Sequence, residues 1–300
     1  MQHEAARNWI ATSDRVRRLV EHPALNDFGP LLLPWVDNSC YFEVPLSRVG
    51  TLMPYHDHVD PVVVVQAINR LISDVNDGKT VFLDFYTERQ KRSHPDKKHT
   101  GLFFFRGKPG APFAIVCPGG GFSYVGSLHE GFPLGVEISE QGYNAFVIRY
   151  RTGSQMSATE DLAAAITYVF RNAKALDIST DAYSLWGGSA GARMVGNIAL
   201  SGTADYGGGT LPKPSAVIIA YTAQSTYSND FPPAFFTVSA DDPIVNAADV
   251  RRRVERLRAA GVRVEFSLFK KAGHGFGLGT GTDAEGWLAR ALRFWRDQMD

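Results

Sequence analysis

From residue 101 onward, short apolar runs alternate with longer segments in which apolar residues recur at helical spacing. The apolar runs predict strands at 102–105, 112–117, 145–148, 182–186, 216–220, 234–238 and 262–269. The segments between and after them predict helices at 130–141, 160–175, 192–200, 247–259 and 285–299. Strands that are apolar on both faces, separated by amphipathic helices, indicate an α/β fold with a mostly parallel sheet covered by helices on both faces.

The first hundred residues follow a less regular pattern. Helices are predicted at 5–20 and, with Asp60 as N-cap and Pro61 in the first turn, up to Asp77; a strand is predicted at 80–86. Residues 22–55 read as a loop whose apolar stretch Leu31–Trp35 should pack on the body, and Arg89–His99 reads as a solvated loop. We therefore expect an N-terminal extension, 1–100, packed on a main domain, 101–300; if any segment covers the site, it is this extension.

Composition narrows the classes of function. The chain has 300 residues with 44% hydrophobic content, and Lys plus Arg equal Asp plus Glu at 31 each. Such a chain can bury a large core, and it has no global basic field to attract nucleic acid or a membrane surface. The first twenty residues carry many charges and lack the apolar segment of a signal peptide, and no apolar run reaches the length of a membrane span. These features predict a cytoplasmic protein.

The two cysteines provide no disulfide framework. Cys40 and Cys117 both lie in apolar contexts, so we expect two buried free thiols.

The candidate chemistry begins with Gly187-Gly188-Ser189-Ala190-Gly191, which lies between a predicted strand and a predicted helix. This is the Gly-x-Ser-x-Gly pattern of a nucleophile elbow, in which the serine occupies a sharp, strained turn and its neighbours must be small. The turn exposes the hydroxyl and puts the amide of Ala190 at a helix N-terminus, where negative charge is stabilised. Ser189 is the candidate nucleophile.

A serine nucleophile needs a base and an acid, which in the hydrolase layout follow it in the order acid, histidine. His274 is the one histidine after Ser189, and it lies between glycines directly after the last predicted strand. Asp241 and Asp242 are the carboxylates that stand at the end of a buried strand between these two residues. The pattern of residues leaves both aspartates as candidates for the acid.

A glycine-rich loop, Pro118-Gly119-Gly120-Gly121-Phe122, follows the predicted strand 112–117. Consecutive glycines allow main-chain N–H groups to point at a single oxygen, as an oxyanion hole requires. A Walker loop is excluded because no Gly-Lys-Ser/Thr follows, and the glycine spacing disfavours a dinucleotide fingerprint.

Together, these segments resemble α/β-hydrolase esterases, particularly the compact bacterial lipase and esterase group with an HGGG-type oxyanion loop. The resemblance covers about residues 100–300 and includes Val147–Arg151, Asp161-Leu162, Asp241–Val245 and Gly273–Gly277. It implies that Asp242, through an Asp-x-x-Val pattern, is the acid, and that Gly120, Gly121 and Ala190 donate to the oxyanion. Pro118 stands where many relatives of this group have histidine.

The resemblance implies a serine carboxylesterase that works through an acyl-enzyme on short-chain, acetyl-type esters and needs no metal or cofactor. There is no room for a cap domain between the strands at 216–220 and 234–238, and Phe122 and Tyr124 are expected to contact substrate. The stretch His56-Asp57-His58 offers no third ligand at a recognisable spacing, so it is not interpreted as a metal site.

Two alternatives remain open from the sequence. The same triad could hydrolyse small aminoacyl, peptide or lactone substrates, or the fold could bind a small molecule without catalysis. The expected partner is a small-molecule ester rather than nucleic acid or a membrane, and the oligomeric state, a homo-oligomer included, is left open.

Overall fold

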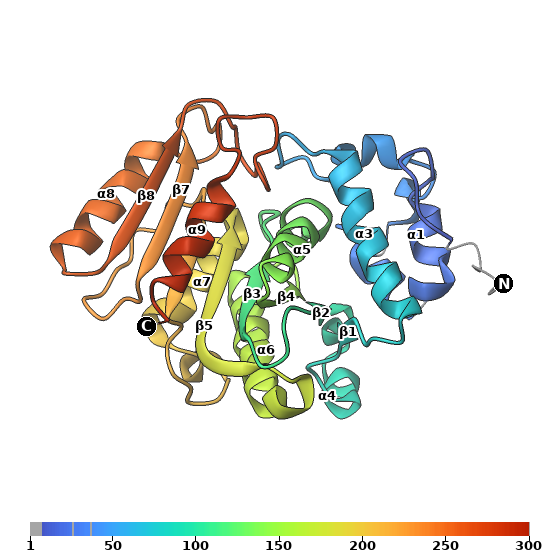
Figure 1. The fold of residues 1–300 in the computed structure, drawn as a ribbon, viewed down its shortest axis with the longest axis horizontal. Helices are drawn as coiled ribbons and strands as arrows, with labels where there is room; N and C mark the ends of the chain where they lie inside the picture. The colour runs from blue at the N-terminus through green and yellow to red at the C-terminus, as the bar shows by residue number, and fades with distance from the viewer. Residues whose placement is uncertain (1–7, 26, 37, 300) are drawn as a thin grey trace.

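An eight-stranded sheet forms the centre of the molecule in the computed structural model, which describes residues 8–25, 27–36 and 38–299 (Figure 1). The order of the strands is β1-β2-β4-β3-β5-β6-β7-β8. Their bounds are β1 Phe82–Leu83, β2 Gly101–Phe105, β3 Pro112–Cys117, β4 Asn144–Arg149, β5 Ser179–Gly188, β6 Ala216–Ala220, β7 Ala234–Ser239 and β8 Val264–Phe269. β2 is antiparallel to its neighbours β1 and β4. The six strands β4-β3-β5-β6-β7-β8, in their order in the sheet, are parallel to one another.

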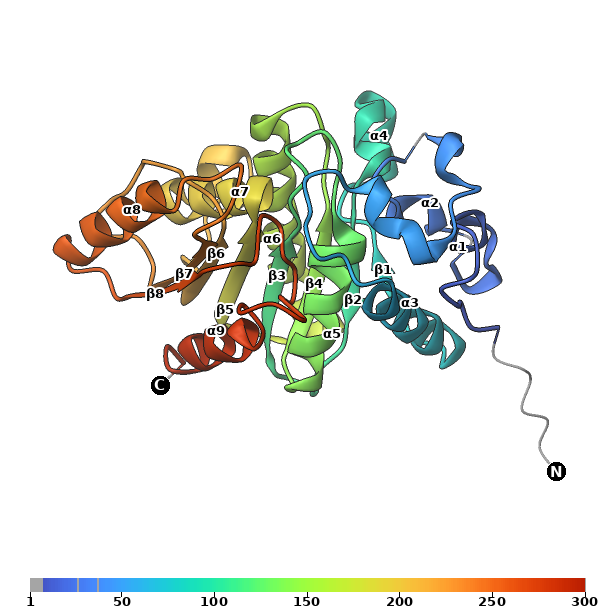
Figure 2. The same cartoon turned by 90° about the horizontal axis from the view of Figure 1, so that it is seen from above.

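Helices cover both faces of this sheet. Figure 2 shows α3 (Pro61–Asn76), α5 (Phe132–Glu140) and α9 (Trp287–Arg296) on one face. The other face carries α6 (Gln155–Leu176), α7 (Ser189–Ser201) and α8 (Ala247–Ala259). β4, β6 and β7 are buried along their whole length, as their apolar sequences require. The predicted α/β-hydrolase architecture is confirmed.

The N-terminal hundred residues pack directly on this body. They contain the short helices α1 (Arg17–Glu21), α2 (Gly29–Leu32) and α4 (Glu88–Ser93), and 3₁₀ turns at Pro23–Leu25, Ser39–Tyr41, Leu46–Leu52 and Pro95–His99. α3 packs against α5, β1 pairs with β2, and a single hydrophobic core joins the extension to the body. The N-cap role predicted for Asp60 is confirmed, because its side chain accepts the N–H of Val62 at 2.8 Å. The division at residue 100 stays a prediction.

The loop predicted at 22–55 contains α2 and 3₁₀ turns, and the strand predicted at 80–86 is reduced to Phe82–Leu83. Two further predictions of secondary structure in the extension are wrong. The described part of the predicted helix 5–20 is helical from Arg17 only, because residues 14–16 exchange backbone hydrogen bonds with residues 44–46 instead; residues 5–7 lie outside the described residues. The expected loop Arg89–His99 contains most of α4, whose first turn is closed by a capping box between Thr87 and Gln90.

Cys40 also departs from its prediction. Cys117 is buried in β3, but Cys40 is exposed because it lies in the surface 3₁₀ turn Ser39–Tyr41, where the side chain of Asn38 accepts its N–H. Its neighbours Tyr41 and Phe42 are partly buried against the hydrophobic core, but the thiol of Cys40 lies outside it.

The chain between β6 and β7, residues 221–233, contains no helix or strand. The structure therefore has no inserted cap at this position, as the sequence predicts. None of the helices that the structure describes is long and apolar enough to cross a membrane.

Candidate active site

Ser189 lies where β5 ends and α7 begins, at the carboxyl edge of the sheet. Its φ of +49° places a non-glycine residue in the left-handed region, which is the strain expected of a nucleophile elbow. The start of α7 passes so close to the end of β3 that a Cβ on Gly191 would collide with the carbonyl oxygen of Cys117. The glycine at position 191 is therefore required by the close approach of two backbones.

The structure brings Ser189, His274 and Asp242 together. Oγ of Ser189 lies 2.9 Å from Nε2 of His274, and Nδ1 of His274 lies 2.8 Å from Oδ2 of Asp242. The side chains of His274 and Asp242 are 2% and 0% exposed, whereas Ser189 is partly exposed. β7 and β8 are paired up to Ser239 and Phe269, so the loops that carry the aspartate and the histidine leave the sheet side by side.

The geometry distinguishes the two candidate aspartates. Oδ1 of Asp242 accepts the N–H groups of Ile244 and Val245, both at 2.8 Å, which orients its other oxygen toward His274. Asp241 instead points to the main chain before His274 and accepts the N–H groups of Ala272 and Gly273. A hydrogen bond from Ser239 and these main-chain donors lower the pKa of Asp241. Asp241 therefore supports the histidine loop and does not contact the imidazole.

The glycine-rich loop lies beside Ser189 because β3 and β5 are neighbours, with Cys117 paired to Gly187. A Cβ on Gly119 would be 2.9 Å from Cβ of Ser189. In the described part of the chain, the backbone N–H groups of Gly120, Gly121 and Ala190 have no hydrogen-bond acceptor. Free donors beside a serine hydroxyl are what an oxyanion hole requires.

The two aromatic residues predicted to contact substrate lie in different environments. Phe122 is partly exposed, follows the glycines with a φ of +58°, and packs edge-on against Tyr150. Tyr124 is fully buried, with its ring against Trp35 and Tyr55 and its hydroxyl bonded to the N–H of Tyr55. The prediction for Tyr124 is therefore not supported, because its ring supports the loop from inside.

Glu130 is an active-site residue that the sequence did not reveal. It belongs to a π-helical turn, Ser127–Gly131, and its carboxylate lies under the elbow, where it accepts the N–H of Gly119. Burial alone would raise its pKa, but the nearby imidazole of His56 and the donors Gly119 and Tyr221 lower it to about 2. Glu130 is thus a buried anion that fixes the first glycine of the loop.

The neighbouring His129 is also buried. Its Nε2 lies 2.9 Å from the carbonyl oxygen of Gly275, the residue after the candidate base. Burial, with the nearby charge of His56, lowers the pKa of His129 to about 4, so the ring is neutral at pH 7. A neutral ring in this position supports the histidine loop without adding charge to the site.

The stretch His56-Asp57-His58 approaches the same centre from the N-terminal extension. Nε2 of His56 lies 3.2 Å from Oε1 of Glu130, and its Nδ1 lies 2.8 Å from the hydroxyl of Tyr124. Asp57 bonds to the backbone of His274. Among the residues that the structure describes, no group of three or more His, Cys, Asp or Glu side chains could hold a metal ion.

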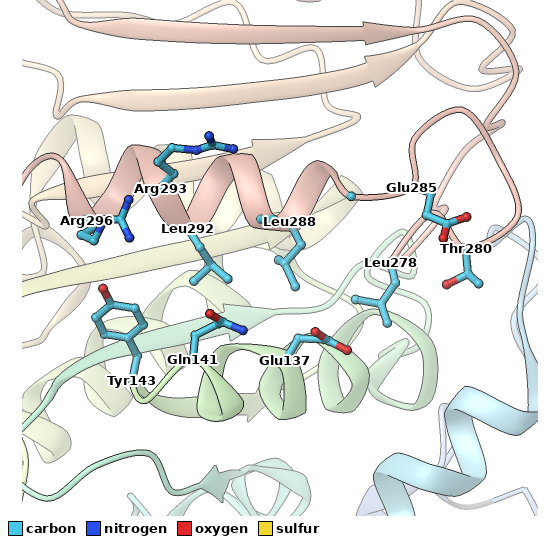
Figure 3. Close-up of a pocket in the computed structure, with 12 residues that line it drawn as sticks. Glu137, Gln141, Tyr143, Leu278, Thr280, Glu285, Leu288, Leu292, Arg293 and Arg296 are labelled. Carbon is cyan, nitrogen blue, oxygen red and sulfur yellow. The ribbon is translucent and has the colours of Figure 1, made fainter.

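Two cavities lie outside the triad, one between two helices and the other at the end of a strand. A cavity of about 600 Å³ between α5 and α9 is lined by Glu137, Tyr143, Leu288, Arg293 and other residues, none of them from the triad (Figure 3). A cleft of about 450 Å³ lies where β4 ends and is lined by Trp35, Ser123, Tyr150, Thr152 and others. Ser123, in the turn that follows the glycine loop, lines this cleft. The cleft lies at the end of β4, the neighbour of β3, and β3 leads into the glycine loop.

Comparison with known proteins agrees with this architecture. The model of the BD-FAE family matches residues 106–213, which include the glycine loop and Ser189 but end before Asp242 and His274. Endo-1,4-beta-xylanase B of Butyrivibrio fibrisolvens is 31% identical over 127 residues, 37% of this chain. This chain spans about a fifth of that relative's length, 19%.

Several solved structures share the fold. An α/β-hydrolase enzyme from a Medee basin deep-sea metagenome library has a TM-score of 0.56 and 25% identity, covering 67% of this chain and 93% of its own. An acetyl ester-xyloside bifunctional hydrolase from Caldicellulosiruptor lactoaceticus has a TM-score of 0.61 and 19% identity, covering 72% and 95%. A carboxylesterase from Lactobacillus plantarum WCFS1 has a TM-score of 0.57 and 21% identity, covering 66% and 92%. These likenesses show that the chain has the α/β-hydrolase fold, and the matched family model contains the elbow that carries Ser189.

Proposed function

We propose that this protein is a serine carboxylesterase that hydrolyses short-chain, acetyl-type esters. The observation that carries the proposal is the continuous chain of contacts from Ser189 through His274 to Asp242, at 2.9 and 2.8 Å. A nucleophile, a base and an orienting carboxylate in this order are the parts that acyl transfer requires. The free amides of Gly120, Gly121 and Ala190 beside Ser189 supply the oxyanion hole.

The reaction proceeds in two steps. Nε2 of His274 takes the proton of Ser189 as Oγ attacks the ester carbonyl, and the resulting oxyanion accepts hydrogen bonds from the amides of Gly120, Gly121 and Ala190. Asp242 accepts the N–H at Nδ1 and stabilises the imidazolium. The intermediate collapses when His274 returns the proton to the departing alkoxide, leaving an acyl-enzyme. A water then gives a proton to His274 and attacks the acyl carbonyl. As this second intermediate collapses, His274 returns the proton to Oγ of Ser189, which releases the carboxylic acid and restores the free enzyme.

The surroundings of the glycine loop favour a small acyl group. A Cβ on Gly121 would be 3.0 Å from the ring of Tyr55, so an aromatic side chain of the extension borders the loop, with Phe122 following it. The cleft at the end of β4 is lined by aromatic and polar side chains, which suits a polar alcohol part. A relative named as an acetyl ester-xyloside hydrolase and a match to a xylanase support an acylated carbohydrate as the substrate.

The proposal predicts how activity depends on the length of the acyl chain. With p-nitrophenyl esters from acetate to dodecanoate, we expect kcat/KM to be highest for acetate or butyrate and to fall as the chain lengthens, since the rings of Tyr55 and Phe122 border the loop. Acetylated xylosides, assayed beside lactones and aminoacyl amides, test the alcohol part. Rates that increase beyond octanoate would contradict the short-chain assignment, and turnover of the amides alone would favour the aminoacyl alternative.

A further inference from the structure

The segment Tyr55–Asp57 touches the candidate base although it is far from it in the sequence. The N–H of Asp57 donates to the carbonyl oxygen of His274 at 2.8 Å, and Oδ2 of Asp57 accepts the N–H of His274 at 2.8 Å. Both polar groups of the His274 backbone are therefore held by one residue. The matched family model begins at residue 106, so this contact lies outside it.

The segment is itself fixed by buried contacts. The hydroxyl of the fully buried Tyr124 bonds to the N–H of Tyr55 at 3.0 Å and to Nδ1 of His56 at 2.8 Å. Nε2 of His56 also lies 3.2 Å from Oε1 of the buried Glu130, and both side chains are nearly inaccessible, 1% and 2% exposed. The carboxylate of Asp57 therefore extends from a rigid base, although Asp57 itself lies at the surface.

The glycine before His274 fits the same arrangement. Gly273 has a φ of +65°, and a Cβ on it would collide with Oδ2 of Asp57. The loop before His274 therefore needs glycine at position 273 to leave room for the carboxylate of Asp57. Asp241 holds the two residues before His274, through the amides of Ala272 and Gly273.

From these contacts we propose that Asp57 is a positioning residue for His274, so that the N-terminal extension is a working part of the active centre. The inference rests on the proposed function of the triad. Asp57 accepts a hydrogen bond as a charged group, which strengthens it, and the bond fixes the backbone from which the imidazole reaches Ser189. Because a displacement of about 1 Å in a catalytic group can cost about 100-fold in rate, a loosened His274 lowers kcat.

The test compares Asp57→Ala with Asp60→Ala. Asp60 lies three residues after Asp57 and its side chain also accepts one backbone N–H, at 2.8 Å, but it caps α3 and does not touch the active site. Losing either bond should lower the melting temperature slightly. We expect kcat on p-nitrophenyl acetate to fall about 10-fold in Asp57→Ala with KM within about twofold, and to stay near the wild-type value in Asp60→Ala.

Asp57→Asn supplies the rescue, because its amide oxygen can accept the same N–H; we expect it to recover most of kcat. A readout independent of turnover is the low-field NMR resonance of the imidazole N–H bonded to Asp242, which should broaden in Asp57→Ala and remain in Asp60→Ala. A kcat in Asp57→Ala within twofold of wild type, or equal losses in both alanine variants, overturns the inference. Failure of the proposed function is a separate result, since it shows as a wild-type enzyme no faster than Ser189→Ala.

Discussion

Replacing Ser189 with alanine is expected to lower kcat on p-nitrophenyl acetate by about 10⁵-fold while leaving the protein folded. The hydroxyl is the atom that attacks, and it lies 2.9 Å from the base in a partly exposed position. Alanine keeps the Cβ and the backbone turn, so the packing of the elbow is unchanged. The measurement is steady-state hydrolysis, with residual rates corrected for the uncatalysed reaction.

The control for this variant is its thermal unfolding, which should match the wild type to within a few degrees. A folded Ser189→Ala protein that keeps more than about one hundredth of the wild-type kcat would mean that another group carries the attack. The remaining activity should come from the amides of the glycine loop and from substrate binding, which do not depend on the hydroxyl.

Asp242→Asn is expected to lower kcat by about 10⁴-fold, because it imposes the wrong tautomer on His274. One oxygen of Asp242 accepts two backbone N–H groups, so the asparagine oxygen is held there and its NH₂ faces Nδ1 of the imidazole. Nδ1 must then accept a hydrogen bond, which leaves the proton on Nε2. A protonated Nε2 cannot take the proton of Ser189.

The matched variant is Asp241→Asn, one position earlier in the same loop. The introduced amide would keep an oxygen for the hydrogen bonds from Ser239 and Gly273, so we expect a loss of less than about 10-fold. Comparing kcat of the two variants on the same ester distinguishes the orienting acid from the residue that supports the loop. Similar losses in both, or a larger loss in Asp241→Asn, would contradict the assignment of Asp242.

The sequence predicts the main domain well because its signals are local. Buried parallel strands read as apolar runs, and Ser189, His274 and the adjacent aspartates each follow such a run directly. Parallel strands end at one edge of the sheet, so residues that follow them come together without further information. The choice between Asp241 and Asp242 is not local, since it depends on which carboxylate the backbone of residues 244–245 orients.

The extension and its contacts are predicted poorly because they depend on residues far apart in the sequence. Residues 14–16 have a helical pattern but bond to residues 44–46, and Asp57 finds its partner at His274, far along the chain. Glu130 could have been noticed as a charged residue between apolar neighbours, yet its environment comes from His56, Tyr221 and Gly119, which no periodicity connects. Tyr124 reads as a pocket residue from its position beside the glycines, and tertiary packing buries it.

The central claim is that Ser189 is an activated nucleophile, and reaction with a fluorophosphonate tests it most directly. The serine oxygen displaces fluoride from phosphorus, and its proton goes to His274, so the reagent requires the same pair as the ester. Intact-mass analysis should show one phosphonyl adduct on the wild-type protein, located on Ser189 by peptide mapping, and none on Ser189→Ala. An unlabelled wild type, or an adduct that persists in Ser189→Ala, would contradict the account and favour a hydrolase fold that binds a small molecule without catalysis.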